Sequence, residues 1–233
     1  GPTSIYVSSL LAPELLAAIA VTAYSYMSLV PIIQPPIMRL LTTQKERRIR
    51  MPYAPRPVPR VAVISFPIIV TVVVGLLVPE SAPLVATLML GSLLKESGVV
   101  PQLTKSAENE LTNISTLFLG LTIGSLMQAE TFLQVQTLYI LLLGLAAFVL
   151  DTVAGLFFGK LLSMATGGKV NPLVGAAGIS AFPMSGRLVQ KVAQEEDFTN
   201  HVLMHAMGAN TAGQLGSVIA GGVLLALVTQ ILG

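Results

Sequence analysis

Long apolar runs separated by short polar stretches make up most of the chain. A helix needs about 20 mainly apolar residues to cross a bilayer, and the runs that approach this length are 14–33, 61–79, 111–128, 133–158 and 211–232. Shorter or interrupted apolar pieces, which do not fit single regular spans, lie at 3–12, 82–94, 172–183 and 201–208. The pattern predicts an all-α, multi-pass membrane protein with broken or re-entrant helices.

Composition supports a bilayer as the solvent of this chain. Hydrophobic residues make up 53% of its 233 residues and charged residues 10%, against about 25% charged in an average soluble domain. The absence of cysteine excludes disulfides and thiolate metal sites, and two histidines argue against zinc. A net charge of +2, with no interleaved basic and aromatic residues, gives no surface for nucleic acid.

Basic residues are concentrated in one polar stretch, residues 39–60. Seven of the 13 basic residues lie there, with Glu46 as the single acid: Arg39, Lys45, Arg47, Arg48, Arg50, Arg56 and Arg60. By the positive-inside rule this loop is cytoplasmic, and we expect a multi-pass protein of the cytoplasmic (inner) membrane. Prolines at 52, 55, 57 and 59 predict an extended linker. We therefore expect membrane segments in 1–38, a cytoplasmic loop at 39–60 and a membrane domain over 61–233, with broken helices near 172–187 and 201–216.

Charges in the remaining connections agree with one in-out alternation. Lysines at 95, 105, 160 and 169 fall in alternate connections, whereas 79–81 and 128–130 carry no base. The alternation holds if the short piece 82–94 crosses the membrane. Glycine pairs at 120/124 and 155/159 predict close helix packing.

The stretch from Asn171 to Arg187 is apolar enough to enter the membrane but poor in helix formers. It contains two prolines, three glycines, two serines and an asparagine, which weaken a regular helix. Backbone groups freed in hydrocarbon cost several kcal/mol each unless they face protein or water. Freed carbonyls and Asn or Ser oxygens suit Na⁺ or H⁺-linked transport, so this stretch predicts an ion site.

A second polar element, His205 to Gln214, places Asn, Thr and Gln between two apolar runs. Together the two elements suggest two broken helices that converge. The alternative is that these small polar residues only form hydrogen bonds between helices, each worth about 0.6 kcal/mol.

Three further side chains are candidates for chemistry. Arg187 could hold a carboxylate or carbamate in bidentate fashion, or it could be an ordinary interfacial arginine. Tyr26 could deliver a proton or an oxygen ligand, or could anchor the helix at the interface. Asp151 is an intramembrane acid, functional by default, unless it lies at a helix end or pairs with Lys160.

Several longer words of the sequence point to one family. They are Gly1-Pro2-Thr3-Ser4-Ile5-Tyr6, Ala23-Tyr24-Ser25-Tyr26-Met27, Leu29-Val30-Pro31-Ile32-Ile33-Gln34-Pro35-Pro36, Lys95-Glu96-Ser97-Gly98-Val99-Val100, Asn171 to Arg187, and Leu203-Met204-His205-Ala206-Met207-Gly208. With these words the chain resembles the C-terminal portion of the β subunit of the sodium-pumping, biotin-dependent decarboxylases, which act on oxaloacetate, methylmalonyl-CoA, glutaconyl-CoA or malonate.

The resemblance implies a membrane subunit that decarboxylates carboxybiotin and couples this to Na⁺ export with proton uptake. It implies a carboxyltransferase/biotin-carrier subunit and a small membrane subunit as partners, and an oligomer. Which acid supplies the CO₂ is left open, because a β subunit receives carboxybiotin in every case.

The same resemblance implies roles for particular residues. Asn171, Gly175, Ser180 and Asn210 would belong to the Na⁺ and proton pathway, Tyr26 and Ser180 would lie near the coupling chemistry, and Arg187 would serve carboxybiotin or the gate. Asp151 matches no family position.

The start of the chain also departs from a complete family member. The family places an acidic Na⁺ ligand immediately before the Gly1-Pro2-Thr3 word. We expect a preceding stretch to supply this acid and the other half of an inverted repeat, so the fragment alone should not pump.

Two other classes of function fit the residues without the resemblance. Broken helices also occur in non-enzymatic Na⁺- or H⁺-coupled secondary transporters, and an apolar chain could merely anchor a soluble enzyme. Dependence on carboxybiotin separates the first from a decarboxylase, and loss of function on replacing Asn171 or Ser180 separates the second.

Overall fold

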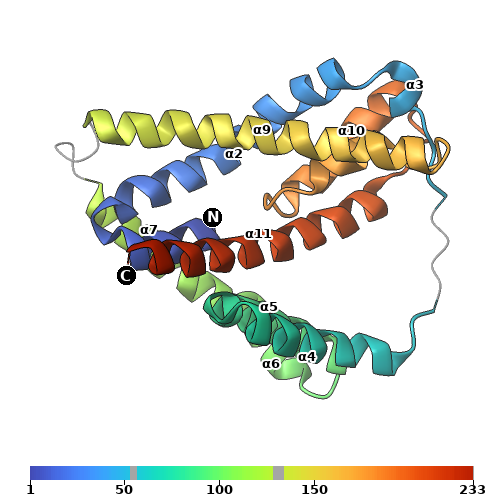
Figure 1. Ribbon diagram of the computed structural model, residues 1–233. Helices are drawn as coiled ribbons and strands as arrows, with labels where there is room; N and C mark the ends of the chain where they lie inside the picture. The colour runs from blue at the N-terminus through green and yellow to red at the C-terminus, as the bar shows by residue number, and fades with distance from the viewer. Residues whose placement is uncertain (53–56, 128–133, 233) are drawn as a thin grey trace. The chain divides into compact units, whose positions relative to one another are not determined.

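The computed structural model describes residues 1–52, 57–127 and 134–232, and these ranges contain helices and no strand. The α-helices are α1 (Pro2–Leu11), α2 (Leu16–Leu41), α3 (Gln44–Arg47), α4 (Arg60–Leu77), α5 (Ala82–Ser97), α6 (Pro101–Ser106), α7 (Thr112–Leu126), α9 (Val135–Ala165), α10 (Met184–Glu196) and α11 (Leu203–Leu232) (Figure 1). Short 3-10 turns η1 (Pro13–Leu15), η2 (Pro79–Ser81) and η4 (Pro172–Ala177) and a π turn, η3 (Ala107–Leu111), complete the described elements. The expected all-α class is confirmed.

Four helical stretches are long and apolar enough to cross a membrane: Pro13–Leu41, Arg60–Leu77, Val135–Ala165 and Leu203–Ile231. They correspond to four of the five long apolar runs. The fifth run, 111–128, forms α7, whose 15 residues follow directly on η3. The connection 128–130 lies outside the described residues. Multi-pass membrane character is thus supported by four spans.

The basic stretch begins later than its composition suggests. α2 continues through Pro31, Pro35 and Pro36 and ends at Leu41, because a membrane helix tolerates proline where neighbouring groups satisfy the freed carbonyls. A capping box between Thr43 and Glu46 then starts α3. Positions 53–56 of the predicted linker lie outside the described residues.

The segment 171–187 is not a regular α-helix. Asn171 caps the 3-10 turn η4, residues 178–183 are bends and turns, the Phe182–Pro183 peptide bond is cis, and α10 starts at Met184. The residue before a proline is disfavoured in α-helical conformation, and glycines at 175 and 178 weaken a helix further. Local chemistry therefore favours this interrupted backbone, which we call the interrupted segment (residues 171–183).

The second expected break, at 201–216, is wrong. α11 is continuous from Leu203 to Leu232, so within 201–216 only His201 and Val202 are irregular backbone. A helix satisfies its own backbone groups within hydrocarbon. Asn210, Thr211 and Gly213 therefore stay helical, although each has a weak intrinsic preference for the helix. Asn210 and Gly213 instead contact the backbone of the interrupted segment, as described below.

One compact unit holds the interrupted segment. It comprises residues 22–52 and 135–217 together with Gly1, and its buried apolar core draws on α2, α9, η4, α10 and α11. The core residues are Val30, Met38, Leu156, Leu173, Ala176, Ala177, Ile179, Ala181, Leu188, Val189, Val192, Ala193, Val202 and Ala206. Four helices and the irregular backbone are thus packed around common side chains.

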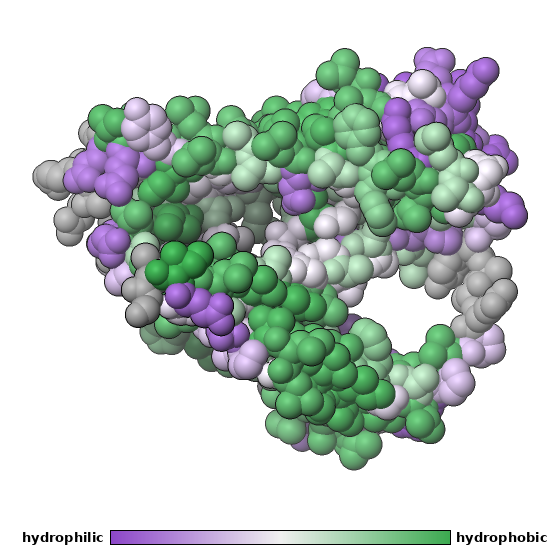
Figure 2. All heavy atoms as spheres, viewed as in Figure 1, coloured by the Kyte–Doolittle hydropathy of each residue, from purple (hydrophilic) through white to green (hydrophobic). Residues whose placement is uncertain are grey.

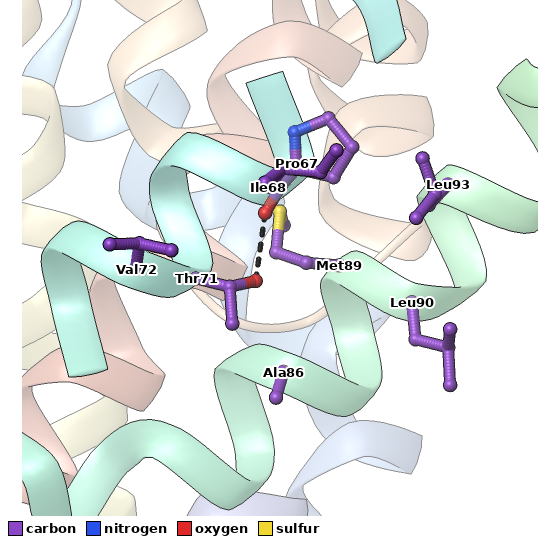
Figure 3. A pocket seen from close by; sticks show the side chains of 8 residues that line it. All are labelled: Pro67, Ile68, Thr71, Val72, Ala86, Met89, Leu90 and Leu93. Carbon is purple, nitrogen blue, oxygen red and sulfur yellow. Dashed lines mark hydrogen bonds between the residues drawn. The ribbon is translucent and has the colours of Figure 1, made fainter. Parts of the chain in front are cut away.

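The other unit comprises residues 2–21, 57–127 with Gln134, and 218–232. Its α4 and α5 pack side by side and enclose a hollow lined by Pro67, Ile68, Thr71, Val72, Ala86, Met89, Leu90 and Leu93 (Figure 3). The Thr71 hydroxyl, the one side-chain hydroxyl of that lining, donates to the Pro67 carbonyl at 2.7 Å. The hollow therefore offers apolar contact and no chemistry.

Side chains at the surface match a lipid environment. Hydrophobic residues cover much of the visible face of the helices, and hydrophilic ones gather near α3 (Figure 2). Many large apolar side chains are exposed, among them Leu40, Leu76, Leu77 and Ile231. In a soluble protein so much exposed apolar surface would be a liability.

Contacts inside each unit agree with the predicted sidedness. In the first unit Lys160 Nζ lies 3.4 Å from a Glu46 carboxylate oxygen of the basic loop. In the second, Arg60 donates to the Ser97 carbonyl at 2.9 Å, so the ends of α4 and α5 meet there. Lys160 thus contacts the basic loop in one unit, and Arg60 joins the start of α4 to the end of α5 in the other.

Candidate functional site

Asn171 fixes the start of the interrupted segment to the basic loop. Its amide Nδ2 donates to the carbonyls of Arg47 at 3.0 Å and Ile49 at 2.9 Å. Its Oδ1 accepts the backbone N–H of Leu173 at 3.0 Å, which caps η4. The side chain is fully buried, and these bonds occupy both amide hydrogens and one oxygen lone pair.

Gly175 brings the interrupted segment into direct backbone contact with α9. A Cβ at Gly175 would overlap the Gly155 carbonyl oxygen and lie 2.9 Å from its carbon and 3.0 Å from the Gly159 Cα. A Cβ at Gly159 would lie 3.2 Å from the Pro172 Cα. The predicted 155/159 glycine pair thus packs on η4, whereas no described atom lies within 4 Å of a Cβ at Gly120 or Gly124.

The bend at 178–180 rests on α11. Asn210 Nδ2 donates to the Ile179 carbonyl at 2.7 Å, and Gly213 is in contact with the Gly178 backbone, where a Cβ would overlap the carbonyl. Asn210 is fully buried, and within the described ranges its Oδ1 has no hydrogen-bond partner. The interrupted segment and α11 therefore do converge, although α11 itself is unbroken.

Ser180 lies beside this contact and is exposed. Of the hydrogen bonds among described residues, none involves its hydroxyl, while its carbonyl accepts the Phe182 N–H at 3.0 Å. The hydroxyl is therefore free to bind a ligand next to the Ile179–Asn210 bond.

Gln34 and Ser185 join the other end of the interrupted segment to α2. Gln34 Nε2 donates to the Ala176 carbonyl at 2.7 Å, and the Ser185 hydroxyl lies 2.9 Å from Gln34 Oε1 and 3.0 Å from the same carbonyl. Both side chains are fully buried. Neither residue was among the predicted site residues, although Gln34, a glutamine between apolar residues and prolines of a span, was a signal in the sequence.

Tyr26 packs against α9 at Gly144. A Cβ at Gly144 would lie 3.1 Å from the Tyr26 Cζ and 3.2 Å from the Thr22 Cγ2. The Tyr26 hydroxyl is buried, and the Leu145 backbone beside it gives no hydrogen bond of good geometry. Within the described residues the hydroxyl thus lies in a buried place beside α9.

Arg187 lies in the first turn of α10 and is exposed. Its guanidinium forms neither an ion pair nor a hydrogen bond with any described residue. A planar fork of five N–H donors without an internal partner is suited to a carboxylate or carbamate from outside.

Three consecutive acids at the end of α10 bind three arginines of the basic loop. Arg39 pairs with Glu195, Arg47 with Glu196 and Arg50 with Asp197, at 2.7, 2.5 and 2.7 Å. We call these contacts the arginine ladder. The middle pair is the most buried, with 9% and 17% of the two side chains exposed.

Two carboxyls at this end are held ionised. Bonds from Thr199 and Arg50 lower the pKa of Asp197 to about 2. Burial would raise the pKa of Glu46, but hydrogen bonds from Thr43 and the charge of Lys160 outweigh it and lower that pKa. The loop end is therefore a fixed set of charges at neutral pH.

Asp151 fits neither of its two structural alternatives. It lies in the middle of α9, is exposed, and has no ion pair among the described residues, while Lys160 pairs with Glu46 instead. Its role stays open.

The predicted site residues thus fall into three groups. Ser180 and Asn210 lie at one contact, Asn171 and Gly175 hold the segment in place, and Tyr26 and Arg187 lie on α2 and α10 of the same unit. The described residues contain no cluster of three His, Asp or Glu that would suit a divalent metal. Neutral oxygens from backbone, Asn and Ser suit a monovalent cation such as Na⁺.

Comparison with known proteins decides the family. Residues 1–228 match the family described as the Na⁺-transporting oxaloacetate decarboxylase beta subunit. This chain belongs to that family. Among relatives of this β-subunit family, the probable oxaloacetate decarboxylase beta chain of Pasteurella multocida (strain Pm70) is 54% identical over 232 residues, which is 100% of this chain and 53% of that protein.

Relatives of the β-subunit family carry different substrate names. The methylmalonyl-CoA decarboxylase subunit beta of Veillonella parvula is 52% identical over 99% of this chain and 61% of its own length. The glutaconyl-CoA decarboxylase subunit beta of Acidaminococcus fermentans is 50% identical over 98% and 60%. The chain therefore spans about half to three fifths of the length of these curated relatives, and similar identities to all three leave the acid undecided.

Proposed function

We propose that this chain acts, within a complete β subunit in the cytoplasmic membrane, to decarboxylate carboxybiotin and to couple that reaction to Na⁺ export and proton uptake. Carboxybiotin would arrive on a carboxyltransferase/biotin-carrier subunit, with a small membrane subunit completing an oligomeric complex. The other half of an inverted repeat, and an acid preceding Gly1, would complete the ion site.

One observation carries this proposal: an irregular backbone segment meets a buried asparagine whose oxygen has no partner. Asn210 is fully buried, its Nδ2 holds the Ile179 carbonyl, and within the described residues its Oδ1 is unsatisfied. An unsatisfied buried polar group costs about 1–3 kcal/mol. A Na⁺ bound by Asn210 Oδ1 and the Ser180 hydroxyl would remove that cost.

Proton and sodium would compete for this region. In the proposed mechanism Na⁺ binding displaces a proton from the polar site, and Tyr26 and Ser180 lie near its transfer. The proton reaches the ureido nitrogen of carboxybiotin as the C–N bond breaks, so that CO₂ leaves and biotin is restored. General acid help of this kind is worth about 10²- to 10⁴-fold in rate.

Arg187 would bind the carboxylate of carboxybiotin. Its exposed guanidinium, without a partner among the described residues, can form a bidentate pair with the carbamate. Collapse of the carbamate to neutral CO₂ would then weaken that pair and release the carrier.

The proposal is tested in proteoliposomes that hold the complete β subunit with its partner subunits. Decarboxylation of the carboxybiotinylated carrier and ²²Na⁺ movement are measured together, with Na⁺ replaced by K⁺ at constant ionic strength. Wild type should turn over only with Na⁺, and Ser180→Ala should lower both rates together by roughly tenfold or more, because a hydroxyl ligand is lost.

The matched control is Ser125→Ala. Ser125 is exposed on α7, and its hydroxyl donates to the Thr122 carbonyl at 2.8 Å, so both rates should stay at the wild-type level. Sodium-independent turnover would refute the coupling. Sodium movement without consumption of carboxybiotin would instead indicate a secondary transporter, and full activity of Ser180→Ala would indicate an anchor.

A further inference from the structure

Two buried asparagines hold the same pair of backbone carbonyls. Asn171 Nδ2 donates to Arg47 O and Ile49 O at 3.0 and 2.9 Å. Asn200 Nδ2 donates to the same two oxygens at 3.0 and 3.2 Å. An amide NH₂ has two hydrogens, and a carbonyl oxygen has two lone pairs. The four bonds therefore use both hydrogens of each asparagine Nδ2 and both lone pairs of the Arg47 and Ile49 carbonyl oxygens.

The two asparagines stand at the starts of the two elements that form the candidate ion contact. Asn171 caps η4 and leads to Ser180, and Asn200 lies three residues before α11, which carries Asn210. The turn Arg47–Ile49 of the basic loop therefore links the interrupted segment to α11. We call this set, Asn171, Asn200 and the turn, the amide clamp.

Other contacts keep the amide clamp rigid. Gln190 Nε2 donates to the Asn200 carbonyl at 3.0 Å, and its Oε1 accepts the Val202 N–H at 2.7 Å. The Arg47 side chain bonds to Glu196 and to the Thr42 carbonyl. Asn171 and Asn200 are 0% and 1% exposed, so water has little access to replace a lost bond.

The same bonds leave Asn171 poorly suited to bind Na⁺. A cation needs an oxygen, and Asn171 Oδ1 faces the Leu173 N–H, which it accepts at 3.0 Å. The N–H groups at the start of a helical turn disfavour a cation. Asn210 differs from Asn171, because its Oδ1 lacks a partner among the described residues. Asn200 Oδ1 also lacks one, but both amide hydrogens of Asn200 are fixed on the Arg47 and Ile49 carbonyls.

We propose that Asn171 and Asn200 are a pair of positioning residues, which set the spacing of Ser180 and Asn210 through the basic loop, and that Asn171 is not a Na⁺ ligand. This inference rests on the proposed function of the Ser180–Asn210 contact. It assigns a role to Asn200, which no motif or compositional feature of the sequence had indicated. It also makes the basic loop a structural part of the ion site.

The test compares Asn171→Ala, Asn200→Ala and the double variant in the complete decarboxylase. Each single change leaves the same two carbonyls short of donors, so we expect similar losses of turnover. The double variant should be no slower than the worse single one, because groups that act as a unit are not additive. The Na⁺ concentration for half-maximal rate should differ less than twofold between the two single variants.

Asn171→Asp separates positioning from ligation. It keeps an oxygen for the Leu173 N–H but places a carboxylate against two carbonyls, so we expect turnover as low as in Asn171→Ala. A Na⁺ ligand would tolerate this change. If Asn171→Asp keeps wild-type Na⁺ dependence, or if Asn171→Ala alone raises the half-maximal Na⁺ concentration tenfold, the inference is wrong.

A readout without turnover covers variants that are inactive. Trypsin cleavage after Arg48 or Arg50 in the folded, complete protein should be accelerated to the same degree by Asn171→Ala and by Asn200→Ala. Asn113→Ala, at an exposed position of α7, should cleave at the wild-type rate. Unequal acceleration would refute the amide clamp even if the protein proved not to depend on Na⁺, whereas a sodium-independent wild type would refute only the proposed function.

Discussion

At Gly175 two backbones touch with no side chain between them. The contact with Gly155 on α9 leaves no space for a methyl group, and neither partner can rotate away because both obstacles are backbone. Position 175 is therefore under steric constraint whether or not its carbonyl binds an ion. Such constraint explains a glycine here without assigning it a ligand role.

Gly175→Ala should lower the free energy of unfolding of the complete protein by about 1–3 kcal/mol, as overpacked cores do. Gly216→Ala is the control, since no atom lies within 4 Å of a Cβ on this α11 position; replacing a helical glycine there should stabilise by about 0.5–1 kcal/mol. SDS titration in mixed micelles measures both. Equal stability of the two variants would contradict the close contact.

Single residues could be predicted from the sequence only where a polar residue type interrupted an apolar stretch. Asn210 and Ser180 stood out as oxygens in apolar surroundings, and the structure brings their elements together. Asn200 did not stand out, because its Nδ2 partners are backbone carbonyls 151 and 153 residues away in sequence. Backbone carbonyls have no residue identity, so no sequence pattern reveals that pairing.

At the scale of elements, the arginine ladder ties α10 to the end of α2 and to the turn after it. Its three pairs differ in environment: Arg47–Glu196 is nearly buried, whereas Arg39 and Glu195 are 49% and 38% exposed. Arg47 also donates to the Thr42 carbonyl. The middle pair should therefore carry most of the stability.

Arg47→Ala should lower the free energy of unfolding by about 3 kcal/mol, because Glu196 is left nearly buried and unpaired. Arg39→Ala should cost about 0.2–1 kcal/mol, as exposed pairs do. The same SDS titration applies, with the cytoplasmic loop intact in both variants. Similar losses would mean that burial does not distinguish the two pairs.

The two polar elements show where propensity decides and where it does not. Pro172, Pro183 and the glycines between them predicted irregular backbone, and η4 with its following bends is irregular. Asn210, Thr211 and Gly213 are also weak helix formers, though far less so than proline, and α11 continues through them. Proline removes a donor and clashes, whereas small polar residues only lower a preference that hydrocarbon overrides. Gly213 then makes room for the Gly178 backbone.

On the scale of the whole molecule, sidedness can be tested because the chain has no cysteine of its own. Pro13–Leu41 is one span, so Glu14 and Lys45 should lie on opposite sides. Lys45→Cys in the complete protein should react with an impermeant maleimide in inside-out vesicles, and Glu14→Cys in right-side-out vesicles. Labelling of both from one side would contradict a crossing by α2.

Four of the five long apolar runs were readable as spans from hydropathy, since length and apolarity define a candidate crossing. Which helices pack against one another inside a unit could not be predicted from hydropathy. Helices in lipid associate through complementary shape and a few polar contacts, and these leave weak traces in composition. The chain also spans only about half to three fifths of the length of its relatives. Contacts with the part of the relatives that this chain does not cover therefore cannot be predicted from this sequence.

The arginine ladder sets a condition on every sodium titration of this protein. Its outer pairs are exposed, and dissolved salt weakens interactions between such charges over about 8–10 Å. Added NaCl would thus loosen the loop that holds Asn171 and Asn200 while it fills the ion site, and the two effects would merge into one binding curve. Replacing Na⁺ by an inert cation at constant total salt holds the screening of the arginine ladder constant. Any change that remains then reports Na⁺ binding at the ion site.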